Sequence, residues 1–114
     1  MNDIQQLRKG STDLLILSVL QAEPKYGYQI MQEIKQDSNG YFDMTAALLY
    51  PALKRLETDG MVTSEWQVAT GKRERKYYEI TDQGRKTLTK RHGDWITFVQ
   101  NLFQTLQLPH PQTI

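Results

Sequence analysis

The sequence predicts a mostly α-helical fold with one small β-hairpin and a long C-terminal helix, on three observations. Apolar residues recur at helical spacing in three segments between residues 11 and 59. Two stretches of alternating apolar and polar residues then flank a basic, glycine-containing loop. A last segment repeats apolar residues every three or four positions over about 25 residues. This order of elements is typical of a winged helix-turn-helix that continues into one long helix.

The first helix is expected after Gly10, where Ser11 or Thr12 can cap its free amides. Because it is apolar on nearly every side, we expect it at the centre of the core. Glu23-Pro24 ends this region. The apolar residues of the helix are Leu14, Leu15, Ile16, Leu17, Val19 and Leu20.

The second and third helices are separated by the turn 38–40. The second is expected from about Tyr26 to Asp37, with its apolar residues at helical spacing. The third is expected to start near Thr45, a good N-cap, and to end at Gly60, which suits a left-handed backbone. Pro51 lies near the start of the third helix, so we expect a distorted first turn rather than a break.

The hairpin is expected from two strands, Met61–Val68 and Lys76–Ile80, joined by the loop 69–74. Tyr77 and Tyr78 must point to opposite faces of their strand, so one belongs to the core and the other is exposed. Trp66 is interpreted as strand packing in preference to a functional residue.

The last helix is expected from Asp82, capped by Thr81, to about Leu106, before Pro109 and Pro111. At 1.5 Å per residue it would extend roughly 37 Å, too far for a small domain to cover. A second subunit is the natural cover for its heptad seam, so we expect a homodimer. The predicted interface is Leu88, Trp95, Ile96, Val99, Leu102, Phe103 and Leu106.

The chain therefore divides into three predicted parts. Residues 1–81 form a winged helix-turn-helix DNA-binding domain, residues 82–108 a dimerisation helix, and residues 109–114 a tail.

Composition excludes several classes of protein. The 114 residues contain no cysteine, no apolar run long enough to cross a membrane and no apolar signal-peptide core, so we expect a cytoplasmic protein. The only histidines are His92 and His110, and no carboxylate pair or phosphate-binding glycine loop occurs. We accordingly expect no enzyme, no cofactor and no metal site.

The net charge is only +1, yet basic residues gather in the hairpin loop. Such a run taken alone is more often a solvated face than a binding site. At the tip of a wing, however, it can reach phosphates or a narrow minor groove. On the third helix, Lys54 can neutralise a phosphate and Tyr50 can touch DNA, although Tyr50 could equally be a core aromatic. The candidate DNA contacts are Thr45, Ala46, Leu48, Tyr50, Lys54, Lys72, Arg73, Arg75, Lys76 and Tyr77.

Trp95 in the seam has two interpretations. Dimer packing is the preferred one, and a pore in which Trp95 and its symmetry mate stack on a flat aromatic compound is the other. His92 is interpreted as a packed seam residue in preference to a ligand or a pH switch. The candidate effector pocket comprises Leu14, His92, Trp95 and Val99.

Three motifs resemble those of the PadR-like transcriptional regulators. Residues 49–57, LYPALKRLE, followed by Gly60, resemble the recognition helix of that family. Residues 75–81, RKYYEIT, followed by Gly84, resemble its wing and the start of its C-terminal helix. Residues 24–28, PKYGY, with Ile30 are similar to the turn that opens its second helix. The resemblance covers about residues 8 to 88, and the single last helix resembles the shorter subgroup.

This resemblance implies a homodimer whose C-terminal helices pack against the partner's first helix. It also implies repression of nearby promoters that small molecules relieve. It also implies that Trp95 can line a pocket between subunits for flat aromatic compounds, with Leu14 facing the same space. Two residues depart from the family pattern. Leu48 replaces a usual threonine, which removes a hydroxyl, and Val99 stands where drug-sensing members can have an acidic residue.

Two functional hypotheses remain open at this point. The first is a repressor that binds an inverted-repeat operator in double-stranded DNA as a dimer and responds to a small aromatic effector. The alternative is a winged-helix adaptor that assembles with protein partners and binds DNA only weakly. Neutralising Arg73 and Lys76 should nearly abolish operator binding under the first hypothesis and change little under the second.

Overall fold

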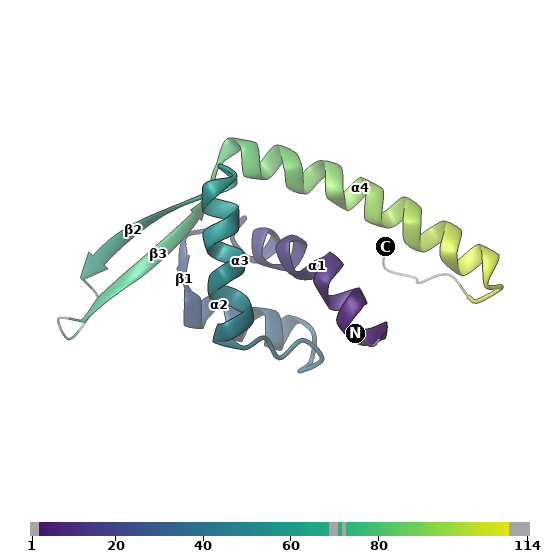
Figure 1. The fold of residues 1–114 in the computed structure, drawn as a ribbon, viewed down its shortest axis with the longest axis horizontal. Helices are drawn as coiled ribbons and strands as arrows, with labels where there is room; N and C mark the ends of the chain where they lie inside the picture. The colour runs from purple at the N-terminus through teal and green to yellow at the C-terminus, as the bar shows by residue number, and fades with distance from the viewer. Residues whose placement is uncertain (1–2, 69–70, 72, 110–114) are drawn as a thin grey trace.

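The computed structural model describes residues 3–68, 71 and 73–109 (Figure 1). It contains four helices and one small antiparallel sheet, which confirms the predicted fold class. In chain order the elements are α1 (Asp3–Val19), β1 (Lys25–Tyr26), α2 (Gly27–Asp37), α3 (Ala46–Thr58), β2 (Val62–Val68), β3 (Glu74–Ile80) and α4 (Asp82–Thr105).

The start of the first helix was predicted wrongly. Helix α1 begins at Asp3, so Ser11 and Thr12 lie inside it and do not cap it. Residues 4–9 are mostly good helix formers, and a single interior glycine costs only about 1 kcal/mol relative to alanine. Gly10 therefore does not end the helical segment that precedes it.

The two-residue strand β1 was not predicted. Lys25 pairs with Tyr78 and Tyr26 with Tyr77, so β1 joins the edge of the hairpin and the sheet order is β1-β3-β2. A two-residue strand has no periodicity that could identify it, since alternation needs at least four residues to be recognised. Its consequence is that the start of α2 is fixed to the base of the wing.

The core forms where the three N-terminal helices meet the base of the hairpin (Figure 1). Tyr78 belongs to this core, while Tyr77 lies half-buried on the opposite face of β3, its ring 5.4 Å from that of Tyr26. The buried apolar residues are Ile16, Leu17, Leu20, Ile30, Ile34, Leu49, Ala52, Leu53, Leu56, Val62, Tyr78, Ile80 and Leu88.

Leu88 corrects the predicted dimer interface. Its side chain is only 1% exposed and belongs to the core of its own subunit, so it has no surface to offer a partner. The heptad spacing includes Leu88 because a helix that leaves a core continues the same apolar stripe without a change of period.

Helix α3 begins as predicted, with the hydroxyl oxygen of Thr45 accepting a hydrogen bond from the Leu48 amide at 3.3 Å. The helix runs through Pro51 without a break. Pro51 is exposed, and the carbonyl of Ala47, which loses its helical partner, is also at an exposed position where water can replace that bond.

Helix α4 starts against the end of α3 and runs along α1 to the end of the molecule away from the wing (Figure 1). The Thr81 hydroxyl caps it by accepting a hydrogen bond from the Gly84 amide at 3.0 Å. Gly84 allows the start of α4 to lie close to the Met61 backbone, since a Cβ on residue 84 would lie 2.2 Å from the Met61 carbonyl oxygen. Among the described residues, no helix has the length and apolar character needed to span a membrane.

Candidate nucleic-acid interface

Helix α3 has one buried and one exposed face. Leu49, Leu53 and Leu56 face the core, and the five residues predicted to contact DNA are all exposed. Tyr50 is 46% exposed, so the interpretation of Tyr50 as a core aromatic is wrong. The exposed face contains Thr45, Ala46, Leu48, Tyr50 and Lys54.

Tyr50 is held in place by the start of α2. A Cβ built on Gly27 would lie 2.3 Å from the Tyr50 hydroxyl oxygen, so the phenol ring covers the position where any other residue would have a side chain. Gly27 is the first residue of α2, and the free amides of a helix start attract negative charge. The Tyr50 hydroxyl thus lies beside an electropositive helix end.

The register of the hairpin distributes its basic residues over both faces. Lys76 lies opposite Trp66, on the face that also carries Tyr78, whereas Arg75 and Tyr77 lie on the other face. The Arg75 guanidinium lies 4.3 Å from the ring centre of Tyr26, a cation–π contact that orients it. Arg73 is exposed. Lys72 lies outside the described residues.

The start of α2, helix α3 and the wing line one concave surface. One hollow is lined by Tyr26, Tyr28, Tyr50, Arg73 and Arg75. A neighbouring hollow shares Tyr50 and adds Trp66 and Lys76. Phenol hydroxyls, guanidinium groups and an ammonium group can donate hydrogen bonds to phosphate oxygens, so this surface is suited to a polyanion. We call it the wing groove.

Sequence reasoning missed two aromatic residues of the wing groove. Tyr28 entered only through the family motif, and Trp66 was interpreted as packing, although 63% of its surface is exposed. An alternating pattern does identify the two faces of a strand, but it does not reveal where a strand leaves the core and both faces become exposed.

Tyr78 lies at the base of the wing groove with its side chain buried in the core. Burial raises the pKa of its hydroxyl above the ordinary value of 10.0, and the nearby Glu57 carboxylate and Tyr50 raise it further. Ser64 donates a hydrogen bond of 2.6 Å to Glu57, which keeps that carboxylate in position. Tyr78 therefore remains a neutral core residue at ordinary pH.

An apolar row on α4 is only partly covered by the described part of its own subunit. Ile96, Leu102 and Leu106 are exposed, and Trp95, Val99 and Phe103 are half-buried. Phe98, also exposed, packs edge-on against Trp95 with ring centres 5.8 Å apart. The six residues Trp95, Ile96, Val99, Leu102, Phe103 and Leu106 are called the α4 row below.

The described hollow at Trp95 does not include the other candidate effector-pocket residues, Leu14, His92 and Val99. Leu14 packs against the core, and His92 Nε2 lies 3.3 Å from the Ser18 hydroxyl oxygen. Trp95 instead lines a shallow hollow with Asp94 and Phe98. The predicted pocket needs a second subunit, so it stays a prediction. No group of three or more His, Asp or Glu side chains suited to a metal ion occurs among the residues described.

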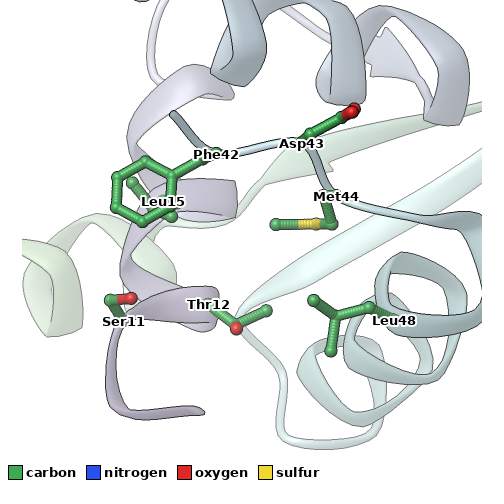
Figure 2. A pocket seen from close by; sticks show the side chains of 7 residues that line it. All are labelled: Ser11, Thr12, Leu15, Phe42, Asp43, Met44 and Leu48. Carbon is green, nitrogen blue, oxygen red and sulfur yellow. The ribbon is translucent and has the colours of Figure 1, made fainter. Parts of the chain in front are cut away.

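A separate small hollow lies behind the start of α3 (Figure 2). It is formed by three segments distant in sequence: α1, the connection between α2 and α3, and α3 itself. Its lining is mainly apolar, with Met44 and Leu48 both pointing toward α1 (Figure 2). Because it depends on how these segments pack, no local pattern in the sequence could predict it.

The comparisons with known proteins establish the family. Residues 16–90 match the model of the transcriptional regulator PadR-like family. The chain belongs to this family. Members are transcriptional regulators rather than enzymes, which confirms both the resemblance found in the sequence and the expectation that the chain is not an enzyme.

Individual relatives agree with this assignment. The chain is 33% identical over 87 residues to a transcriptional regulator from Mycobacterium tuberculosis, covering 76% of this chain and 78% of that protein. It is 28% identical over 92 residues to the negative transcriptional regulator PadR from Bacillus subtilis, covering 81% of this chain and 48% of that protein. It therefore spans about half the length of that relative.

The fold is also shared with solved structures. A PadR family transcriptional regulator from Eggerthella lenta has 31% sequence identity and a TM-score of 0.80, and the match covers 93% of this chain and 90% of that chain. A transcriptional regulator from Clostridium thermocellum has 27% identity and a TM-score of 0.80, covering 87% of this chain and 96% of that one.

Proposed function

We propose that this PadR-like regulator binds an inverted-repeat operator in double-stranded DNA as a homodimer and represses transcription. The observation that carries the proposal is the wing groove, where the exposed face of α3 and the basic wing border one concave surface. In winged helices the recognition helix enters the major groove while the wing lies along the backbone or the minor groove. Arg73, Arg75 and Lys76 supply charges for the phosphates there.

The homodimer is supported by the α4 row. Exposed apolar side chains in one continuous row are unfavourable in water, and contact with a second copy removes them from it. An antiparallel pair of α4 helices related by a two-fold axis would bring the same residues of both subunits together. Two recognition helices would then face the same DNA about one turn, or roughly 34 Å, apart.

In this proposal a small aromatic effector releases the repressor from its operator. Trp95 is half-buried, its ring is oriented by Phe98, and it lines a shallow apolar hollow. A second subunit would close this hollow and bring two indole rings to one space in which a flat molecule can stack. Quenching of Trp95 fluorescence by planar aromatic compounds in Trp66→Phe, with no quenching in Trp95→Phe, tests this part.

The alternative function is a protein-binding winged helix with weak affinity for DNA. It is favoured only by the exposed apolar surface of the wing, which protein partners can also use. The concentration of basic side chains around Tyr50 favours DNA, because a row of phosphates can pair with several positive charges on one surface.

Fluorescence anisotropy tests the two functions. The protein is titrated into labelled DNA from upstream of its own gene and into scrambled DNA, across a series of salt concentrations. Specific regulation predicts a preference of roughly a thousandfold or more and an affinity that falls steeply with salt. Arg73→Gln with Lys76→Gln should nearly abolish binding, while Arg85→Gln with Lys86→Gln on α4 serves as the charge-matched control. Equal, weak binding to both DNAs by the wild type and both double variants would favour the adaptor.

A further inference from the structure

The inner face of the wing carries two apolar side chains that the recognition of phosphates does not require. Trp66 is 63% exposed and Val68 is 71% exposed. Both lie on β2 beyond the last residue that reaches the core, at positions where a strand facing water is ordinarily polar. An exposed tryptophan beside an exposed valine indicates a contact surface rather than packing.

The register of the sheet determines which way Trp66 points. Ser64, two residues earlier on β2, lies on the same face as Trp66 and donates a hydrogen bond to Glu57 of α3. Val62, two residues earlier again, is buried in the core. The face of β2 that carries Trp66 and Val68 is therefore the face turned toward α3. Trp66 accordingly lines the same hollow as Tyr50.

The charges around this face favour DNA as its occupant. Lys76 lies directly opposite Trp66, with its Nζ 6.0 Å from the indole centre. Arg75 and Glu74 also line the hollow, although Arg75 lies on the other face of β3 by register, so Lys76 is the cation nearest to the indole. The outer surface of a DNA duplex alternates phosphates with deoxyribose rings, which present apolar edges along the minor groove. A surface that places an indole beside an ammonium group is complementary to this alternation.

We propose that Trp66, extended by Val68, is a DNA contact of the wing: the indole packs on deoxyribose at the edge of the minor groove while Lys76 holds the adjacent phosphate. This inference rests on the proposed operator binding and adds to it an apolar contact. Such a contact releases no counterions, so its contribution does not depend on salt, whereas each lysine–phosphate contact steepens the salt dependence.

The test is a salt series of anisotropy titrations with operator DNA for the wild type and three variants. Trp66→Thr is expected to weaken binding about tenfold at every salt concentration, with an unchanged slope of log affinity against log salt. Lys76→Gln is expected to weaken binding and to make that slope shallower by about one. Trp66→Phe, which retains an aromatic ring, is expected to recover most of the lost affinity. Because Trp66 is exposed, none of these changes should lower the melting temperature appreciably.

Tryptophan fluorescence gives an independent readout. In Trp95→Phe all emission comes from Trp66, and saturating unlabelled operator should quench or shift it. Unchanged affinity of Trp66→Thr, with unchanged Trp66 emission on binding, would overturn the inference while leaving operator binding by the wild type intact. Failure of the wild type to prefer any DNA would overturn the proposed function and this inference together.

Discussion

Gly27 and Tyr50 pack together, and this contact orients the Tyr50 ring in the wing groove. An exposed tyrosine on a helix would ordinarily sample several rotamers, and fixing it on binding costs conformational entropy. Here the ring already lies over the backbone of Gly27, with no side chain beneath it. The motif around Gly27 was recognised from the sequence as a family feature, but its contact with a residue 23 positions away (50 − 27) is a property of packing.

Replacing Gly27 by alanine should displace the Tyr50 ring and weaken operator binding. The added Cβ would overlap the hydroxyl oxygen at 2.3 Å, and the flexible phenol is easier to move than the backbone. We expect an affinity loss of about tenfold with little loss of thermal stability. In a Tyr50→Ala background the same change should have almost no further effect, and an equal loss in both backgrounds would show that Gly27 acts without Tyr50.

Tyr78 predicts a pH dependence of stability at the alkaline end. Its pKa in the folded protein is raised above 10.0, first by burial and then by Glu57 and Tyr50. The folded state therefore holds this proton more tightly than the unfolded state does. The resulting stabilisation is fully present below pH 10 and is lost as the pH rises through the folded pKa.

Tyr78→Phe should make stability less sensitive to pH above 10, because phenylalanine has no proton to lose. Urea unfolding between pH 8 and pH 11, on both sides of the ordinary tyrosine pKa of 10.0, measures this sensitivity. Tyr28→Phe, a change at an exposed tyrosine, is the matched control and should retain the full wild-type decline. If the free energy of unfolding declined equally steeply above pH 10 in Tyr78→Phe and in the wild type, Tyr78 would not be the cause of the decline.

At the scale of elements, patterns with enough repeats were predicted well. Helix α3 with its Thr45 cap, the two hairpin strands and helix α4 follow from periodicity and capping residues. The start of α1, the strand β1 and the burial of Leu88 were not predicted. Each depends on a partner elsewhere in the chain, and such a partner leaves no local pattern.

Asp13 provides a further contact between elements that the sequence did not indicate. Its carboxylate on α1 forms ion pairs with Arg55 of α3 and, at 3.8 Å, with Arg91 of α4. It thereby joins the recognition helix and the predicted dimerisation helix to the same central helix. Ion pairs with exposed arginines of this kind contribute little to stability.

Leu88 and Leu102 should behave differently although both belong to the predicted heptad seam. Leu88→Ala removes a buried core side chain and should lower the free energy of unfolding by about 2–5 kcal/mol without weakening self-association of the folded protein. Leu102→Ala should leave the subunit core intact and weaken self-association. Thermal unfolding together with sedimentation equilibrium measures both quantities, and weaker association in Leu88→Ala with no loss of stability would return Leu88 to the interface.

At the scale of the whole molecule, the subunit extends 55 Å in its longest direction and only 28 Å and 27 Å in the others. The wing and the free end of α4 lie at opposite ends of this long axis (Figure 1). The wing groove and the α4 row, where self-association is predicted, are therefore separated in space. The net charge of only +1 does not reveal the local basic surface of the wing. The sequence revealed the charge cluster and the seam, but their separation required the structure.

Ile96→Glu with Leu102→Glu should convert a dimer into monomers, since four carboxylates would be buried together in a two-fold interface. Operator affinity should then fall by about 10²-fold or more. In a dimer, binding of one subunit holds the other close to its half-site, whereas separate monomers must bind each half-site independently. Thr97→Glu, on the opposite side of α4, is the control and should remain dimeric. A monomeric double variant with wild-type operator affinity would show that each subunit recognises its site alone.

In the proposed complex, two copies of the wing groove read one operator. Hydroxyl-radical footprinting on the genomic fragment that the protein selects most strongly tests it directly. We expect two symmetric protected regions with centres about one helical turn, or 10 base pairs, apart, each flanked by minor-groove protection from the wing, and loss of the whole footprint in Arg73→Gln with Lys76→Gln. A single unsymmetric footprint, or no fragment selected above scrambled DNA, would contradict it.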